Sequence, residues 1–421
     1  MTASGSETTS GGQEIEPGGR PSLRRFALVC LLIGATAFGG GAMVAYLEDR
    51  FTRRYGWLRD EAFLEAVTLA QSLPGAIATN TVAFIGYRLH GAIGAATGMA
   101  LYALPSGLLM LLFAALYDRV RDIPLATAVF TGLNAAAAGL VTTTAIRLGR
   151  QALDAHWQYI QVIGVFSLAV AVPAMTFPLI VLSLLGGLVS AARRKTNAAA
   201  DTVGRPQTRA SLRGLFLTAA VSGSAVVGLW LAAEAGTDPF LLRVARLALI
   251  ALKIGGLTFG GGFVIIPLLG HEVVDVHGWL TPKELADAAA LGLLTPGPFV
   301  IAAVFIGYRV AGLVGAGVSA VGIFGVPLWL VILVASAVER FRQNRLVQGA
   351  LRAAMPTGVA LLAAAAVTIG KSAYGPAPYT WWLVPALGLA SASLAGRYQM
   401  NPVFVLFGAA AVGLCARWLF E

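Results

Sequence analysis

Long apolar runs, interrupted by short polar segments, follow one another along this chain from Phe26 to Phe420. A run of about 18 or more apolar residues is long enough to cross a lipid bilayer as a helix. Because backbone polar groups find no water inside a bilayer, such runs predict helices, which satisfy these groups internally. The sequence lacks the alternating pattern of a membrane β-barrel. The pattern therefore predicts an all-α polytopic membrane protein.

In the first half of the chain, glycine and proline interrupt the apolar pattern. We expect a helix at 26–46 and a charged loop at 48–61. A broken helix follows, in which Pro74-Gly75 separates a half-helix at 61–73 from a second one that ends at Arg88. Proline removes a backbone donor and disfavours the helical conformation in the residue before it. The remaining apolar runs of this half lie at 92–117, 125–146, 159–172 and 177–191.

Four short motifs occur twice, in the same order and at an offset of 221 or 222 residues. They are Phe38-Gly39-Gly40-Gly41 with Phe259-Gly260-Gly261-Gly262, Gly56-Trp57-Leu58 with Gly278-Trp279-Leu280, Pro74-Gly75 with Pro296-Gly297, and Phe84-Ile85-Gly86-Tyr87-Arg88 with Phe305-Ile306-Gly307-Tyr308-Arg309. Self-similarity at a fixed offset is the signature of a duplicated module. The sequence therefore predicts two repeats with the same local structure.

The second repeat follows the order of the first, with a broken helix at 283–309 and apolar runs at 242–268, 311–338, 347–369, 382–394 and 403–419. The apolar run at 215–233 lies between the repeats and has no counterpart. We divide the chain into a disordered polar tail at 1–21, a first repeat at 22–191, a basic linker at 192–213, a connecting helix at 214–234 and a second repeat at 240–421.

Basic residues predict how the repeats are oriented. Arg20, Arg24 and Arg25 precede the first apolar run, and the linker is rich in Arg and Lys, so both segments should be cytoplasmic. The first repeat then crosses the membrane an even number of times, and the connecting helix turns the second repeat upside down. This is the inverted-repeat plan of many secondary transporters, here with about 13 spans. The arginines of the loop at 48–61, which this scheme places outside, leave a conflict open.

Composition narrows the function classes. Charged residues make up 12% of the chain, about half the usual share of a soluble domain. The net charge of +10 reflects tails and loops that orient the protein in the membrane, so we expect no nucleic-acid partner. Two cysteines and four histidines show no metal-ligand spacing, and nucleotide-binding and catalytic motifs are missing. We therefore predict no metal, no cofactor, no enzymatic activity and no ATP-driven transport by this chain alone.

The duplicated breaks are the candidate binding site. A helix that restarts after Pro-Gly presents free N–H groups and a positive dipole end, which together bind anions. Glycine triplets expose backbone at the repeat interface, where secondary transporters bind substrate. The alternatives are a simple kink and close helix packing. The candidate substrate-binding residues are Gly39, Gly40, Gly41, Gln71, Pro74, Gly75, Asn80, Lys253, Gly260, Gly261, Gly262, Thr295, Pro296 and Gly297.

Lys253 lies in an apolar run six residues before Phe259, and its counterpart in the first repeat is Leu32. A lysine at the centre of a membrane helix costs about 2.5–3.5 kcal/mol, so it usually has a partner or a function. The alternative is that its amine reaches an interface, since Arg243 and Arg246 are about two turns away. We favour a role in holding one anion at one asymmetric site.

Two pairs of ionisable residues are candidates for coupling or gating. Glu65 and Asp287 are counterparts on the half-helices that lead into the Pro-Gly breaks, and paired acids there are suited to proton coupling. The alternative is that they cap a helix or face water. Arg88 and Arg309 end the Phe-Ile-Gly-Tyr-Arg copies. They would serve as gates for an anion or, in the interpretation that we favour, as interfacial anchors.

These motifs resemble the chromate ion transporter family in its long, two-domain form. The resemblance covers about 22–190 and 240–420 and rests on the glycine triplets, on Gln71-Ser72-Leu73-Pro74-Gly75, on Lys253-Ile254-Gly255 and on Thr295-Pro296-Gly297-Pro298. Gly41 and Ala76 stand where the family usually has proline. The resemblance implies export of chromate from the cytoplasm, driven by the membrane potential or an ion gradient, and a relation to sulfate.

The sequence therefore predicts a secondary transporter in the inner (plasma) membrane that exports chromate, with a cytoplasmic N-terminus. A carrier of sulfate or another divalent oxyanion fits the same residues, because these anions share shape and charge. An anion channel lined by the same helix ends is a second alternative. A membrane-bound chromate reductase is disfavoured, because haem ligands, flavin motifs and cysteine pairs are missing. Whether the protein forms a homodimer stays open.

Overall fold

The computed structural model describes residues 19–38, 40–195, 239–259, 262–336, 338, 345–375 and 377–420. These residues form helices joined by short connections, with no β-strand among them. Six helical segments in the described part are long and apolar enough to cross a membrane, at 77–120, 124–152, 173–192, 299–336, 348–372 and 402–420. This confirms an all-α, multi-pass membrane protein.

The first repeat contains nine helical segments, counting short π- and 3₁₀-helices. They are α1 (Leu23–Thr36), α2 (Gly40–Glu48), the π-helix η1 (Asp49–Arg54), α3 (Asp60–Gln71), α4 (Ile77–Val120), α5 (Pro124–Ala152), α6 (His156–Ala171), η2 (Pro173–Met175) and α7 (Thr176–Lys195). The second repeat follows the same order of α- and π-helices, with its 3₁₀-helix ahead of α12. Its segments are α9 (Pro239–Leu257), α10 (Ile265–Leu269), the π-helix η3 (Gly270–Val276), α11 (Pro282–Leu294), η4 (Phe299–Ile301), α12 (Ala302–Ser336), α14 (Arg345–Ser372), α15 (Thr380–Gly396) and α16 (Pro402–Phe420).

Several predicted elements have different boundaries in the structure. The single helix expected at 26–46 is wrong, because α1 ends at Thr36 and Ala37 has an extended backbone. The charged loop expected at 48–61 contains a π-helix. By contrast, the half-helix expected to end at Arg88 does end close to that residue, because the non-helical His90 and Gly91 separate it from the following span within α4.

Some sequence predictions lie wholly or partly outside the described residues. They are the tail at 1–21 up to residue 18, the linker at 192–213 from residue 196 onward, and the whole connecting helix at 214–234. The total of about 13 spans therefore stays a prediction, as does the inverted orientation of the repeats.

The duplicated sequence builds a duplicated backbone. Gly91 has φ 65° and ψ −154° at the kink of α4, and its counterpart Gly312 has φ 61° and ψ −147° at a kink in α12. Each repeat has a π-helix ahead of the Gly-Trp-Leu motif, and the glycines of that motif, Gly56 and Gly278, both have φ 59°. The shared motifs thus fix equivalent turns in both repeats.

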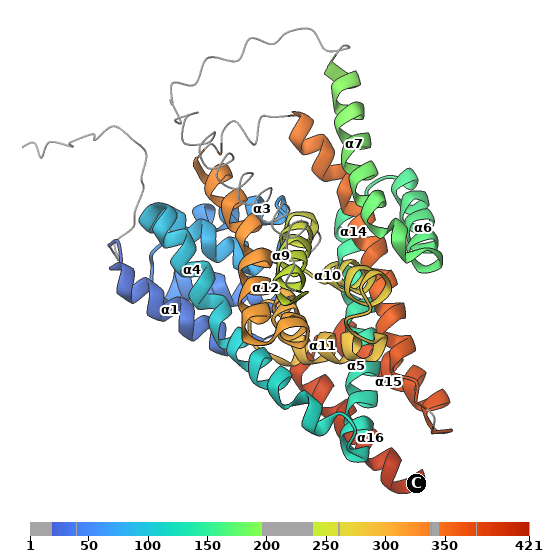
Figure 1. Ribbon diagram of the computed structural model, residues 1–421. Helices are drawn as coiled ribbons and strands as arrows, with labels where there is room; N and C mark the ends of the chain where they lie inside the picture. The colour runs from blue at the N-terminus through green and yellow to red at the C-terminus, as the bar shows by residue number, and fades with distance from the viewer. Residues whose placement is uncertain are drawn as a thin grey trace, which may run out of the picture.

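The helices in the C-terminal part of each repeat pack against those of the other repeat. α5 of the first repeat packs against α15 and α16 of the second, and α14 of the second packs against α6 and α7 of the first (Figure 1). Glycines allow these backbones to come close, as small residues do at helix interfaces in membranes. A Cβ atom on Gly139 would lie 2.3 Å from the carbonyl oxygen of Gly388, and one on Gly187 would lie 2.4 Å from that of Gly349.

The long helices α4 and α12 pack against each other and connect the two repeats. α4 also packs on α1, and α12 packs on α9, in equivalent ways (Figure 1). Gly34 of α1 faces the carbonyl of Tyr102, and its counterpart Gly255 of α9 faces that of Ile323. α4 and α12 each begin just after a Pro-Gly break, so residues from both repeats meet at the breaks.

Candidate functional site

Each Pro-Gly break contacts the other repeat through the backbone just before that repeat's glycine triplet. The N–H of Gly75 donates to the carbonyl of Thr258 at 2.7 Å, and the N–H of Gly297 donates to the carbonyl of Ala37 at 2.8 Å. Thr258 and Ala37 are themselves counterparts, so the two hydrogen bonds are reciprocal. The structure therefore brings together the two motifs that the sequence singled out.

Both breaks need glycine for steric reasons. Gly75 has φ 109° and Gly297 has φ 94°, a region that side chains with a Cβ rarely adopt. A Cβ on Gly75 would lie 3.0 Å from Pro327 of α12, and one on Gly297 would lie 2.8 Å from the hydroxyl of Ser106 in α4. Ser106 and Pro327 are counterparts as well, so the packing of the breaks is reciprocal too.

The first break opens a buried helix N-terminus that carries polar side chains. α4 begins at Ile77, and its N-cap residue Ala76 makes no side-chain hydrogen bond to the first turn. The hydroxyl of Thr79 and the Oδ1 atom of Asn80 are buried and have no hydrogen-bond partner among the described residues. Asn80 donates from Nδ2 to the carbonyl of Pro74 at 2.9 Å, which fixes its side chain at the break. Free N–H groups, a positive dipole end and a buried hydroxyl donor suit an anion.

The second break is apolar at the equivalent positions. η4 begins after Pro298, which also gives no side-chain cap. Val300 and Ile301 take the places of Thr79 and Asn80, and both are buried. The two breaks therefore share the glycine conformation and the reciprocal hydrogen bonds, but α4 begins as an α-helix and η4 is a 3₁₀-helix. Among the described residues, polar side chains follow the first break.

Other predicted binding residues lie around the breaks with different surroundings. Gly262 approaches the start of α4, since a Cβ on it would lie 3.7 Å from the Cβ of Ala76. Thr295 is buried and donates its hydroxyl to the carbonyl of Gly292 at 3.0 Å. Gln71 ends α3 and is exposed. Gly40 and Gly41 begin α2, while Gly39, Gly260 and Gly261 lie outside the described residues.

Lys253 has two partners from other elements. Its amine pairs with the carboxylate of Glu272 in η3 and lies 3.8 Å from the ring centroid of Phe177 in α7. Its charge is thus neutralised in this conformation, and its side chain is about one-third exposed. The counterpart Leu32 is an exposed apolar residue, which makes this contact specific to the second repeat.

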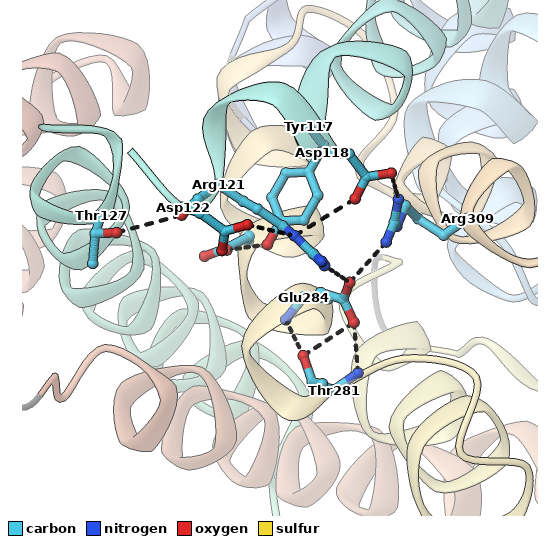
Figure 2. Close-up of polar contacts among 9 residues, drawn as sticks. Tyr117, Asp118, Arg121, Asp122, Thr127, Thr281, Glu284 and Arg309 are labelled. Carbon is cyan, nitrogen blue, oxygen red and sulfur yellow. Dashed lines mark hydrogen bonds and ion pairs between the residues drawn. The ribbon is translucent and has the colours of Figure 1, made fainter. Parts of the chain in front are cut away.

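Arg309 belongs to a charged cluster between the start of α11, the end of α4 and the short part of α12 that precedes its kink. Figure 2 shows Arg309, Arg121 and Thr281 converging on Glu284. One carboxylate oxygen of Glu284 accepts from Arg121 at 2.8 Å and from Arg309 at 2.9 Å. The other accepts from the backbone and hydroxyl of Thr281, which caps α11. Arg309 also pairs with Asp118.

Arg88 makes a smaller and more exposed set of contacts. Its guanidinium binds Glu65 at 3.1 Å and the carbonyl of Ala62 at 3.1 Å. The Arg88 side chain is 46% exposed, against 17% for Arg309. Ala62 is the counterpart of Glu284, so the first repeat has a small apolar residue where the second has the acid at the centre of the cluster.

Asp287 lies one turn beyond Glu284 on α11 and is completely buried. One of its oxygens accepts from the hydroxyl of Tyr117 in α4 at 2.6 Å, and the other accepts from Nδ2 of Asn134 in α5 at 2.7 Å. Its counterpart Glu65 is partly exposed and pairs with Arg88. The two predicted acids therefore have unlike surroundings.

Sequence reasoning missed several polar residues of these sites, among them Thr79, Tyr117, Asn134 and Glu284. Thr79 follows a Pro-Gly break by a single helical turn, and this spacing could have identified it. The other three meet their partners only through the packing of distant helices. No cluster of three or more potential metal ligands occurs in the part of the chain that the structure describes.

The chain is similar in sequence to known proteins over both repeats. The sequence profile of the family described as chromate transporter matches residues 24–191 and again residues 245–414. A probable chromate transport protein of Synechococcus elongatus is 26% identical over 398 residues, 93% of this chain and 95% of its own length. Chromate transport proteins of Cupriavidus metallidurans and Pseudomonas aeruginosa are 26% and 27% identical over 94% and 91% of this chain, and 93% and 90% of their own lengths.

No solved structure shows a significant match to this chain. The profile matches both repeats and so covers most of the sequence. The chain therefore belongs to the chromate transporter family.

Proposed function

We propose that this protein is a secondary transporter that exports chromate, or a closely similar divalent oxyanion, across the plasma membrane. The names of its relatives support the substrate class. The observation that carries the proposal is the buried, uncapped N-terminus of α4 with the free hydroxyl of Thr79, at the place where the two repeats exchange hydrogen bonds. Transporters built from two repeats bind substrate at such an interface.

The anion is held mainly by backbone dipoles and neutral donors. N–H groups of the first turn of α4 and the Thr79 hydroxyl share its charge, and the neighbouring glycines let the chain approach closely. Such a site binds a dianion without the strong attraction of a full positive charge, so that the anion is also released. Lys253 contributes to binding when its amine releases Glu272 and pairs with the anion instead.

Transport follows from the reciprocal arrangement of the repeats. We infer that the repeats have opposite orientations in the membrane, so that the Arg309 cluster and the Arg88–Glu65 pair lie toward opposite sides. The Arg309 cluster closes one side in this conformation. Opening it while the Arg88 side closes would expose the same site to the other side, which is the alternating-access principle of secondary transporters.

Uptake of radiolabelled chromate into inverted vesicles tests the proposal. We expect saturable uptake by the intact protein, and about tenfold weaker apparent affinity in Thr79→Val, because a hydrogen bond to a charged group is worth about 1.5–3 kcal/mol. Thr68→Val is the matched control, since the exposed Thr68 hydroxyl bonds to its own helix at the carbonyl of Leu64. Equal affinity in both variants would remove the α4 terminus from the site.

The same vesicles distinguish the alternative functions. Sulfate that competes fully at equal concentration would broaden the substrate to tetrahedral dianions. Flux that does not saturate, and that shows no counterflow of labelled anion, would indicate a channel. No uptake by folded, inserted protein would reject chromate as the substrate. Loss of uptake in Lys253→Ala with normal uptake in Thr79→Val would move the primary site to Lys253.

A further inference from the structure

Helix α11 carries two buried acids one turn apart whose partners differ in kind. Glu284 is bound by the guanidinium groups of Arg121 and Arg309, which always carry a positive charge. Asp287 is bound by a phenol and an amide, from Tyr117 and Asn134, at 2.6 and 2.7 Å. In the described part of the chain, no lysine or arginine pairs with Asp287 or donates a hydrogen bond to it.

The partners of Asp287 can serve both of its protonation states. A guanidinium only donates hydrogen bonds, so it fits an ionised acid alone. A tyrosine hydroxyl donates or accepts, and an amide turns over to present its oxygen in place of its NH₂ group. The Oδ1 atom of Asn134 is buried without a partner among the described residues, so the rotated amide offers an acceptor to a protonated Asp287.

Burial makes the ionised state of Asp287 costly. The residue has no exposed surface, and removing a carboxylate from water is unfavourable unless a counter-charge is close. Two neutral hydrogen bonds offset part of this cost, whereas taking up a proton removes it. An acid at such a position inside a transporter is a functional candidate rather than a structural one.

Ionisable groups lie on most of the elements around Asp287, but among the described residues Tyr117 is the one that donates a hydrogen bond to it. Its own helix carries Lys283 and Glu284, and α4 carries Tyr117, with Asp118 and Arg121 nearby in sequence; α5 contributes the neutral Asn134. The other elements packed on α11 add further groups. Arg309 of α12 binds Glu284, and Arg417 of α16 donates to the carbonyl of Pro124. Lys371 of α14 is next to Ser372, whose hydroxyl bonds to Pro282 at the start of α11, and η3 carries His271, Glu272 and Asp275. η4 carries none.

We propose that Asp287 binds and releases one proton in each transport cycle and thereby couples oxyanion movement to the proton gradient. This proposal rests on the proposed function. A proton from water on one side forms an O–H bond with the carboxylate, and the same bond breaks when the proton leaves to water on the other side. Tyr117 and Asn134 are positioning residues that stabilise both states.

The structure also connects this proton to the charged cluster. The hydroxyl of Tyr117 binds Asp287, while its ring lies 5.6 Å below the guanidinium carbon of Arg309. Its neighbour Asp118 pairs with Arg309 as well. A change of charge at Asp287 therefore acts directly on Tyr117, which contacts Arg309 together with Asp118 and Glu284. Protonation and opening of the cluster become linked events.

Purified protein in liposomes that contain a pH-sensitive dye tests this proposal. We expect the wild type to move protons when a chromate gradient is imposed, and to accumulate labelled chromate when a pH gradient is imposed. Asp287→Asn, which mimics the protonated state, should lose both responses but still exchange internal for external labelled chromate. Asp154→Asn, an exposed acid between α5 and α6, is the matched control and should behave as the wild type.

The outcomes separate the two proposals. Saturable chromate flux in the wild type without proton movement would overturn the role of Asp287 and leave chromate transport intact. Asp287→Asn that still accumulates chromate under a pH gradient would overturn it too. Absence of any chromate flux would reject the proposed function instead. If Asp287→Asn fails to fold, the wild-type proton measurement still decides, and Tyr117→Phe should shift the pH profile of uptake with its maximal rate retained.

Discussion

The two Pro-Gly breaks share a glycine conformation and a hydrogen-bond pattern, but their chemistry differs. Both use glycine with positive φ, and both bond to the carbonyl before the other repeat's glycine triplet. The break before α4 is followed by Thr79 and Asn80, whereas the break before α12 is followed by Val300 and Ile301. Duplication thus supplied two related breaks, and in the described structure the residues just after the break are polar in the first and apolar in the second.

The acids show the opposite distribution. Glu65 in the first repeat is partly exposed and lies beside Arg88. Asp287 in the second is buried, and Glu284 beside it holds two arginines together. We infer that the two repeats have different roles. The first binds the anion at its break, and the second contains the gate and the coupling acid.

The largest loss of stability is expected at the glycines of the breaks, where the two repeats are most alike. Gly75→Ala should lower the free energy of unfolding by about 3 kcal/mol, because it combines backbone strain with a clash against the rigid ring of Pro327. Thermal unfolding in detergent measures this, with Gly164→Ala as the control, since a Cβ there meets no atom within 4 Å. Equal unfolding temperatures for Gly75→Ala and Gly164→Ala would contradict the steric argument.

The second break offers a rescue that sharpens the comparison. Gly297→Ala should lower the free energy of unfolding somewhat less, by about 2 kcal/mol, because the added Cβ clashes with the hydroxyl of Ser106 rather than with a ring. Ser106→Gly in the same chain should restore part of the lost stability, while the strain from the positive φ remains. No recovery in the double variant would show that Ser106 does not cause the defect.

A smaller effect is expected from the two arginines. Arg309→Met should lower the free energy of unfolding by about 2 kcal/mol, because it removes a positive charge that pairs with Glu284 and Asp118 and is itself mostly buried. Arg88→Met should cost less than about 1 kcal/mol, because its pair with Glu65 is largely screened by solvent. Chemical unfolding of the two variants measures the difference. Equal costs would mean that the Arg309 cluster contributes no more than a surface pair.

Much of this organisation was visible in the sequence. The repeats, the Pro-Gly breaks and the unusual position of Lys253 follow from local pattern, because glycine, proline and a lone lysine constrain the backbone or the membrane wherever they stand. The continuous helix at 26–46 was wrong, because apolar character alone does not register that the backbone turns extended at Ala37, just before the glycine triplet.

The partners of the acids could not be predicted in the same way. Tyr117 and Asn134 lie 170 and 153 residues from Asp287 in sequence, and Arg121 lies 163 residues from Glu284. Their contacts exist because α11 packs against α5 and against the end of α4, and no motif in the sequence states that packing. The packing of C-terminal helices between the repeats has the same origin.

The smallest loss of stability is expected from a variant that tests whether the second break can also bind the anion. Val300→Thr gives the second break the hydroxyl of the first, and we expect it to lower stability by about 1 kcal/mol, because the added hydroxyl is buried among apolar residues. In the Thr79→Val background it should leave the affinity for labelled chromate weak, because Ile301 still replaces Asn80 beside it. Recovery of affinity in the double variant would instead show that either helix end can hold the anion, and the different roles of the repeats would then rest on the acids alone.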